Sequence, residues 1–256
     1  MRILVTRPAE DARRQAEQLK TLGHTPLIFP LLEIVFPRLT PLELDGVQGL
    51  IVTSRNGLRG LQANDAFENA KGLPVYCNGE GTAELAAELG FTRVISGEGR
   101  ASDLVPVICH SARPEDGALL YLTGQYLAYD LETPLIEAGF LVPRVICYEA
   151  HELHPGRAAK LAEIFRGREI HGIILMSPRT AGIFSRIIRR FEVEEEARAI
   201  TCYCYSEAIA KSLEEIDGLT IAISSHPKEA DLMRLIGAAS FRDEALADLE
   251  QALGKR

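Results

Sequence analysis

The sequence predicts an α/β protein made of two similar, doubly wound parallel-sheet domains, one of them discontinuous, joined by two crossover strands. Three observations predict this fold. Short apolar runs alternate with longer segments of helical period along the chain. Segments of the first half recur in the second half at a near-constant spacing, and the order of the recurring units is circularly permuted. The length of 256 residues suits two domains of roughly 100–150 residues each.

The recurring units identify a duplicated domain. Their offsets lie between 123 and 128 residues, too long for the repeats of a solenoid. The repeated pairs are residues 49–54 with 172–177, 75–80 with 202–207, and 95–108 with 223–236.

A fourth unit shows where the chain crosses between the halves. Residues 119–124, followed by Gly139 and Pro143, have their counterpart at the N-terminus, in residues 3–7 followed by Gly23 and Pro26. The chain therefore begins one domain, builds the other and returns. This predicts a discontinuous domain of residues 1–34 plus 149–256, an inserted domain of residues 36–147, and crossovers near 31–37 and 146–153. A double connection still permits hinge motion.

The strands are expected where Val, Ile and Leu cluster in runs of four to seven residues, which is typical of parallel sheets covered on both faces. These runs are residues 3–6, 26–29, 50–53, 74–77, 93–96, 119–122, 173–176, 201–204 and 220–223. The segments between them carry helical stripes, such as Ala12, Ala16 and Leu19. Each half is then a small flavodoxin-like domain. Residues 241–256 form an apolar stripe that predicts a terminal helix docked on a core, with a dimer contact as the alternative.

Composition narrows the classes of function. The net charge of −8 argues against bulk binding of nucleic acid. No apolar run reaches the ~18 residues of a membrane span, and the N-terminus becomes charged too early for a signal peptide. The five cysteines lack C-x-x-C spacing, and three lie in strand-like runs. We expect a cytoplasmic protein whose cysteines are small buried hydrophobes.

The candidate binding residues follow the strands. In open parallel sheets, ligands collect beyond the carboxyl ends of the strands, and helix N-termini there favour anions. The candidates are small, hydroxyl-bearing, amide or arginine residues: Thr6, Arg7, Ser54, Arg55, Asn56, Gly57, Gly79, Gly81, Thr82, Thr123, Gly124, Ser177, Arg179 and Ser206. Ser, Thr, Asn and Gly are also ordinary N-caps, and that reading stays open for any single turn. Recurrence in both halves favours an anion-binding cleft shared by the two domains, in which Arg55 and Arg179 either pair with carboxylates or remain solvated.

Sharper chemistries are not visible in the sequence. No P-loop motif occurs, and Gly79-x-Gly81 lacks the third glycine of a dinucleotide fingerprint. His151 and His154 are spaced H-x-x-H without a further ligand set. We therefore expect no metal and no cofactor, and an enzyme that works mainly by holding and shaping its substrate. The alternatives are a non-enzymatic two-lobed small-anion binder and a nucleotide- or flavin-using enzyme.

The order of the motifs carries a family resemblance. The motifs are Ile-Leu-Val-Thr-Arg-Pro at 3–8, Phe-Pro-Leu at 29–31, Thr-Ser-Arg-Asn-Gly at 53–57, Gly79 with Thr82 and Ala83, Leu-Thr-Gly at 122–124, Val145 with Tyr148, and Met-Ser-Pro at 176–178. Together they resemble the uroporphyrinogen-III synthase family over almost the whole chain. Two positions depart from the family pattern: Ala86 replaces a frequent leucine, and Ile209 lies where the second half usually has threonine.

The resemblance implies a reaction. The family cyclises hydroxymethylbilane, a linear tetrapyrrole with eight carboxylates, to uroporphyrinogen III, with loss of water and inversion of the last pyrrole ring and without a cofactor. Tyr148 matches the tyrosine that projects into the cleft, and it would donate a proton or hydrogen bond to the departing hydroxyl; the alternative is a packed hinge residue. Ser54, Ser177 and Thr82 would bind carboxylates. A monomer is expected, with a transient hand-off from the bilane-forming enzyme left open. An acidic protein must make this cleft locally positive, and Arg7, Arg55 and Arg179 are the expected cations.

Overall fold

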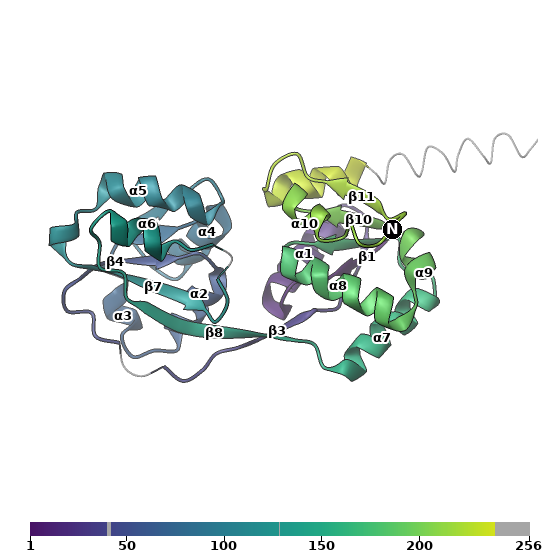
Figure 1. The fold of residues 1–256 in the computed structure, drawn as a ribbon, viewed down its shortest axis with the longest axis horizontal. Helices are drawn as coiled ribbons and strands as arrows, with labels where there is room; N and C mark the ends of the chain where they lie inside the picture. The colour runs from purple at the N-terminus through teal and green to yellow at the C-terminus, as the bar shows by residue number, and fades with distance from the viewer. Residues whose placement is uncertain (40–41, 128, 239–256) are drawn as a thin grey trace, which may run out of the picture. The chain divides into compact units, whose positions relative to one another are not determined.

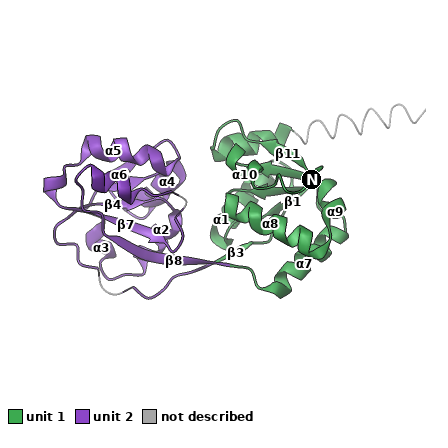
Figure 2. Cartoon of the chain, in the orientation of Figure 1, with its two compact units in different colours: residues 1–33, 152–256 green, residues 34–151 purple. Residues whose placement is uncertain are grey.

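The computed structural model describes residues 1–39, 42–127 and 129–238. The chain divides into two compact units, one of residues 1–33 and 152–256 and the other of residues 34–151 (Figure 2). The first is called unit 1 and the second unit 2. The amphipathic segment 241–256, for which the sequence predicts a docked helix, lies outside the described residues.

Unit 2 contains a six-stranded sheet of order β3-β8-β7-β4-β5-β6 (Figure 1). The neighbouring strands from β8 to β6 pair in parallel. The strands are β3 (Leu32–Val35), β4 (Val47–Val52), β5 (Val75–Cys77), β6 (Val94–Ser96), β7 (Ala118–Gly124) and β8 (Arg144–Glu152). The short strand β3 and the long strand β8 lie at the residues for which the sequence predicts crossovers.

Unit 1 contains a five-stranded sheet of order β11-β10-β9-β1-β2, and all of its paired neighbours are parallel. The strands are β1 (Arg2–Val5), β2 (Thr25–Ile28), β9 (Gly172–Leu175), β10 (Thr201–Cys204) and β11 (Thr220–Ile223).

The two sheets confirm the circular permutation. Reading unit 1 as β11-β10-β9-β1-β2 and unit 2 as β6-β5-β4-β7-β8 places each strand opposite its predicted counterpart. Thus β9 corresponds to β4, which follows the repeat of residues 49–54 at 172–177, and the N-terminal β1 corresponds to β7. Apart from the additional edge strand β3 of unit 2, the strand order is the same in both units, which is the structural signature of a duplicated domain.

Helices cover both faces of each sheet because successive side chains of the buried strands are apolar and point to opposite faces of the sheet. In unit 2, Leu50 and Val52 face α2, α3 and α4, whereas Ile51 faces α5 and α6. Figure 1 shows α5 and α6 on one side of β4 and β7, with α2 and α3 on the other. The helices are α2 (Arg55–Gln62), α3 (Phe67–Ala70), α4 (Glu80–Glu88), α5 (Leu104–Ser111) and α6 (Glu132–Glu137).

Unit 1 repeats this arrangement. Leu4 and Ile173 face α7, α8, α9 and α10, whereas Ile3 and Ile174 face α1 and the helical residues 229–238. The helices are α1 (Ala9–Thr21), α7 (Pro155–Arg166), α8 (Pro178–Phe191), α9 (Glu194–Arg198) and α10 (Glu207–Lys211). Of the described helices, none is both long enough and apolar enough to span a membrane.

The cysteines follow the sequence prediction except at one position. Cys77, Cys147, Cys202 and Cys204 are buried, and burial raises the pKa of each thiol to about 12. Cys109 is exposed, so the expectation that all five are buried is wrong. The reason is its place on α5, where Leu104 and Ile108 take the buried face and Cys109 points away from the sheet.

Candidate active site

In unit 2, two helices begin directly at the carboxyl ends of neighbouring strands. β4 leads into α2 through Ser54, whose Oγ caps the helix by accepting from the Asn56 N–H at 3.2 Å. β5 leads into α4 through Gly79, and no side chain caps this helix. The first turn of α4 therefore keeps amide donors available at the strand end, as an anion site requires. Thr82, in the same turn, is buried.

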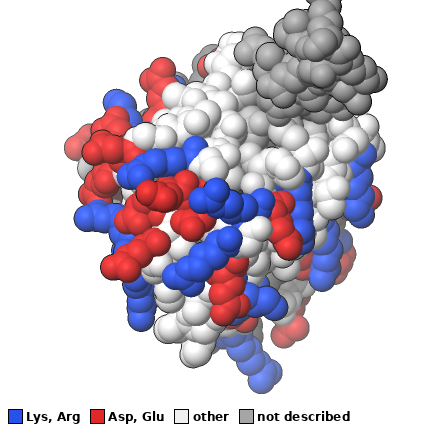
Figure 3. Space-filling view, turned by 90° about the vertical axis from the view of Figure 1, so that its right-hand side faces the viewer, with Lys and Arg blue, Asp and Glu red and all other residues white. Residues whose placement is uncertain are grey.

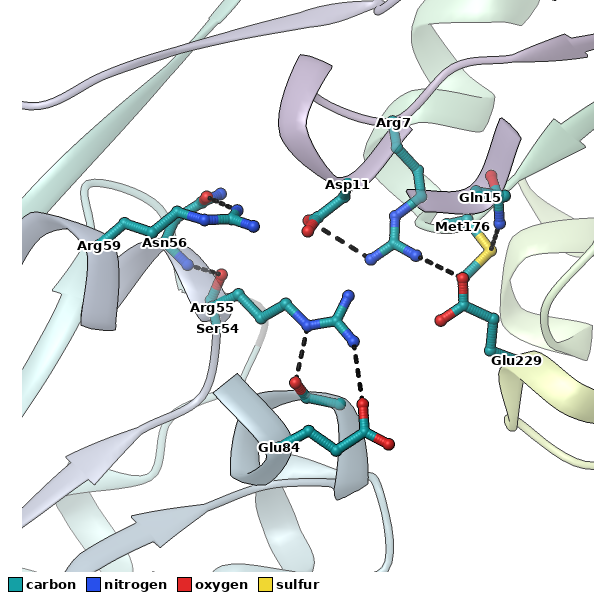
Figure 4. A network of polar contacts seen from close by, with 11 residues as sticks. Arg7, Asp11, Gln15, Ser54, Arg55, Asn56, Arg59, Glu84, Met176 and Glu229 are labelled. Atoms are coloured by element: carbon teal, nitrogen blue, oxygen red, sulfur yellow. Dashed lines mark hydrogen bonds and ion pairs between the residues drawn. The ribbon is translucent and has the colours of Figure 1, made fainter. Parts of the chain in front are cut away.

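Arg55 does not point into solvent. Its side chain is 9% exposed, and its Nε donates to the carbonyl oxygen of Gly81 at 2.7 Å (Figure 4). Its Nη2 lies 3.9 Å from Oε2 of Glu84. The sequence left two roles open for Arg55, pairing with carboxylates or a solvated surface charge. Its burial rules out the solvated surface charge.

Asn56 and Gly57 are also occupied by contacts inside unit 2. Oδ1 of Asn56 accepts from the guanidinium of Arg59 at 2.9 Å. A Cβ atom on Gly57 would lie 2.9 Å from the carbonyl oxygen of Leu122 and 3.1 Å from Cγ1 of Val52. Gly57 thus allows α2 to pack closely on the sheet, a role that the sequence pattern alone does not reveal.

The carboxyl end of β7 brings Thr123, Gly124 and Tyr148 together. A Cβ atom on Gly124 would lie 2.6 Å from Cζ of Tyr148, so the tyrosine ring rests on the glycine backbone. Thr123 is buried, and its Oγ1 has no hydrogen-bond partner among the described residues. No helix begins directly at this turn, since α6 starts only at Glu132.

In unit 1, the carboxyl end of β1, the strand that corresponds to β7, carries an ionic cluster. Thr6 is fully buried and donates from Oγ1 to the carbonyl oxygen of Ile174 at 2.7 Å. Arg7 contacts Oδ2 of Asp11 at 3.4 Å and Oε1 of Glu229 at 3.2 Å (Figure 4). Two carboxylates therefore surround one guanidinium, and Arg7 adds no net positive charge to this edge.

The other two strand ends of unit 1 differ in their caps. Ser177 forms a capping box with Thr180, whose N–H donates to Ser177 Oγ at 3.1 Å. Pro178 supplies no N–H group, so the first turn of α8 has few free donors. Arg179 follows and is half-buried. Ser206 precedes the short α10 without a side-chain cap bond.

Three acidic residues in ion pairs of unit 1, Asp11, Glu229 and Asp231, are absent from the candidates predicted from the sequence. Asp11 and Glu229 bind Arg7, and Asp231 contacts His226 at 2.8 Å and Arg234 at 2.6 Å. The hydrogen bond from His226 and the charge of Arg234 lower the pKa of Asp231. The i, i+4 spacing of Arg7 and Asp11 is a signal that could have identified the first pair. No such local signal joins Arg7 to Glu229, which is 222 residues away.

Two features of the described residues concern metal ligands and surface charge. No group of three or more His, Cys, Asp or Glu side chains suited to a metal occurs among residues 1–39, 42–127 and 129–238. The face in Figure 3 intersperses Lys and Arg with Asp and Glu instead of presenting a basic stripe. A groove of about 610 Å³ lies between α1 and residues 230–238 and is lined by Leu22 and Met233. This groove is not at the carboxyl ends of the strands.

Fold and site together define a class: a duplicated, circularly permuted α/β protein whose polar groups follow the carboxyl ends of parallel strands. Comparison with known proteins identifies the family within this class. The family model described as uroporphyrinogen-III synthase HemD matches residues 13–234. The chain belongs to the uroporphyrinogen-III synthase family, as the motif order implies.

Individual proteins are similar to this chain in part of the sequence or in fold. The chain is 37% identical over 87 residues to a putative uroporphyrinogen-III synthase of Methanocaldococcus jannaschii, a match spanning 33% of this chain and 36% of that protein. Uroporphyrinogen-III synthetase from Helicobacter pylori shares the fold at a TM-score of 0.59 and 19% identity, over 93% of this chain and all of that one. A mutant uroporphyrinogen III synthase from Thermus thermophilus does so at 0.57 and 18% identity, over the full length of both chains.

Proposed function

We propose that this chain is a uroporphyrinogen-III synthase, a cofactor-free lyase that cyclises hydroxymethylbilane with loss of water and inversion of the terminal pyrrole ring. The observation that carries this proposal is the family match over residues 13–234, which includes the candidate strand ends except that of β1 at Thr6 and Arg7. The matching strand order of the two sheets supports it, because both halves of the family's duplicated fold are then present.

The proposed chemistry needs binding groups for carboxylates and one proton donor. The uncapped first turns of α4 and α10 and the turn after Ser54 supply backbone donors to the carboxylates, while the turn after Ser177, where Pro178 lacks an N–H, contributes mainly the serine hydroxyl. Tyr148 supplies the O–H group that donates to the departing hydroxyl as its C–O bond breaks. For the ring to be inverted, the last pyrrole attacks the same carbon through the ring carbon that already carries a bridge, which gives a spiro intermediate. The older bridge C–C bond then breaks, the freed bridge carbon bonds to the unsubstituted α-carbon of the same pyrrole, and that α-carbon loses its proton.

The charge distribution refines how such a polyanion would be held. Arg7 is paired with two carboxylates and Arg55 with Gly81 and Glu84, so neither guanidinium extends freely from its unit. Binding would then depend on short-range hydrogen bonds from amides and hydroxyls more than on long-range attraction, consistent with the net charge of −8. We expect substrate affinity to fall little with added salt.

Product analysis tests the function. Purified protein is given preformed hydroxymethylbilane, and the type III and type I macrocycles are separated by chromatography after oxidation. An excess of type III over the buffer control is expected, because the unassisted closure does not invert the ring. A product mixture identical to the buffer control would reject the proposal. Tight binding of the bilane with no acceleration would instead support the two-lobed anion binder.

A further inference from the structure

Arg55 joins the starts of two helices that approach the same edge of the unit 2 sheet. It is the first residue of α2, and its Nε donates to the carbonyl oxygen of Gly81 in the first turn of α4 (Figure 4). A cation at two helix N-termini is opposed by both helix dipoles. Its burial there is offset by the Gly81 carbonyl and the nearby Glu84 carboxylate, so the pairing determines where the guanidinium lies.

Gly81 makes this close approach possible. A Cβ atom at position 81 would contact Nη2 of Arg55 and would lie 3.0 Å from Cζ. The guanidinium therefore lies directly against the Gly81 backbone, in space that any side chain would occupy. Because the colliding group is the end of a flexible side chain, an alanine at this position would displace the guanidinium without itself pushing against the backbone of α4.

We propose that Arg55 is a positioning residue that keeps the first turns of α2 and α4 in one fixed arrangement, and that it is not a ligand of the substrate. This inference rests on the proposed function. If geometry decides which ring is inverted, the spacing of the amide donors on these two turns controls the product isomer. Weakening the Arg55–Gly81 contact then lowers the fidelity of ring inversion even when every substrate molecule is bound.

The test uses single turnover with enzyme in increasing excess over hydroxymethylbilane. Arg55→Lys keeps the charge but loses the Nε donor, and Gly81→Ala keeps the arginine but displaces it. Arg93→Lys is the matched control, since Arg93 also donates to a backbone carbonyl, that of Gly72, at 2.9 Å in the same unit but away from the strand ends. We expect the two variants, and not the control, to show a type III to type I ratio reduced about tenfold that excess enzyme does not restore.

Each other result overturns the proposal. A ratio restored by excess enzyme would mean that Arg55 binds substrate, and an unchanged ratio would mean that the contact has no role in the reaction. Amide hydrogen exchange of Thr82 and Ala83, whose N–H groups donate to the carbonyl oxygen of Gly79, gives a second readout that needs no activity. Exchange at these amides should accelerate in both variants and stay unchanged in Arg93→Lys. Equal exchange in all proteins would refute the positioning role of Arg55. A wild-type protein that makes only the type I macrocycle would reject the proposed function. The exchange data would still test whether Arg55 fixes the first turn of α4.

Discussion

The ring of Tyr148 lies against the backbone of Gly124, close enough that a Cβ atom at position 124 would be 2.6 Å from Cζ. The two residues belong to neighbouring strands, β8 and β7, and are partners in the sheet register. A tyrosine placed against a glycine has its orientation set by the sheet itself. The contact limits the directions that the phenol can take, as the proposed proton donor would require.

Replacing Tyr148 by Phe should separate chemistry from packing. The ring contact with Gly124 is kept, so the free energy of unfolding should change by less than about 1 kcal/mol. The rate of type III formation should fall by about 100-fold or more if the O–H group assists departure of the hydroxyl. Quenched time courses analysed by chromatography measure the rate. A rate equal to that of the wild type would show that Tyr148 takes no part in the chemistry. Gly124→Ala, which displaces the ring and keeps the phenol, should also lower it.

Gly57→Ala should destabilise the protein. The new Cβ would meet the Leu122 carbonyl oxygen at 2.9 Å, and backbone cannot move aside as a flexible side chain can. We expect a loss of about 1–3 kcal/mol in urea unfolding. Gly182→Ala in α8 is the control: the nearest atom to its new Cβ is 3.6 Å away, so helix propensity should add about 0.5–1 kcal/mol. If Gly57→Ala weakens binding at unchanged stability, a binding role for that glycine is favoured instead.

Arg7→Met should cost far more stability than Arg2→Met. The Arg7 side chain is 15% exposed, and its loss leaves the carboxylates of Asp11 and Glu229 together without a cation. A loss of about 3 kcal/mol is expected at neutral pH. The Arg2 side chain is 38% exposed and pairs with Glu169 at the surface, so its replacement should cost less than about 1 kcal/mol. Equal costs in denaturant titrations would show that the Arg7 cluster is not a structural centre.

Asp231 should make stability depend on acidity. Its pKa is lowered first by the hydrogen bond from His226 and then by the charge of Arg234. A lowered folded-state pKa contributes stability above the unfolded value near 3.8, and this contribution is lost as pH falls through the folded value. His226→Ala should raise the pKa of Asp231, so that acid unfolding begins at a higher pH. Carboxyl titration by NMR measures the shift directly, and an unchanged Asp231 would contradict the assigned cause.

The cysteines should react unequally with a thiol reagent. Burial raises the pKa of Cys77, Cys147, Cys202 and Cys204 to about 12, so these thiols are protonated and inaccessible in the native protein at about pH 8. Only the exposed Cys109 should be modified quickly, and Cys109→Ser should abolish this rapid phase. All five should react in denaturant. More than one fast thiol in the native protein would contradict the described burial.

The architecture could be predicted from the sequence because its determinants are local or repetitive. Apolar runs such as residues 50–53 and 173–176 identify buried strands through their own composition, and a repeated offset identifies a duplication without any knowledge of contacts. The permutation follows from the same comparison. The polar turns could be located for the same reason, since each directly follows a strand that the sequence identifies.

The direction of individual side chains was decided only by the tertiary structure. Arg7 and Arg55 look alike as candidate anion ligands, yet one is surrounded by Asp11 and the distant Glu229, and the other lies on Gly81. Gly57 was predicted as a residue that binds through its backbone, and the structure adds that its missing Cβ lets α2 pack against the sheet. Long cations and close backbone contacts depend on partners that the fold brings together from far along the chain. Local periodicity cannot specify such partners, because it carries no information about which surfaces meet.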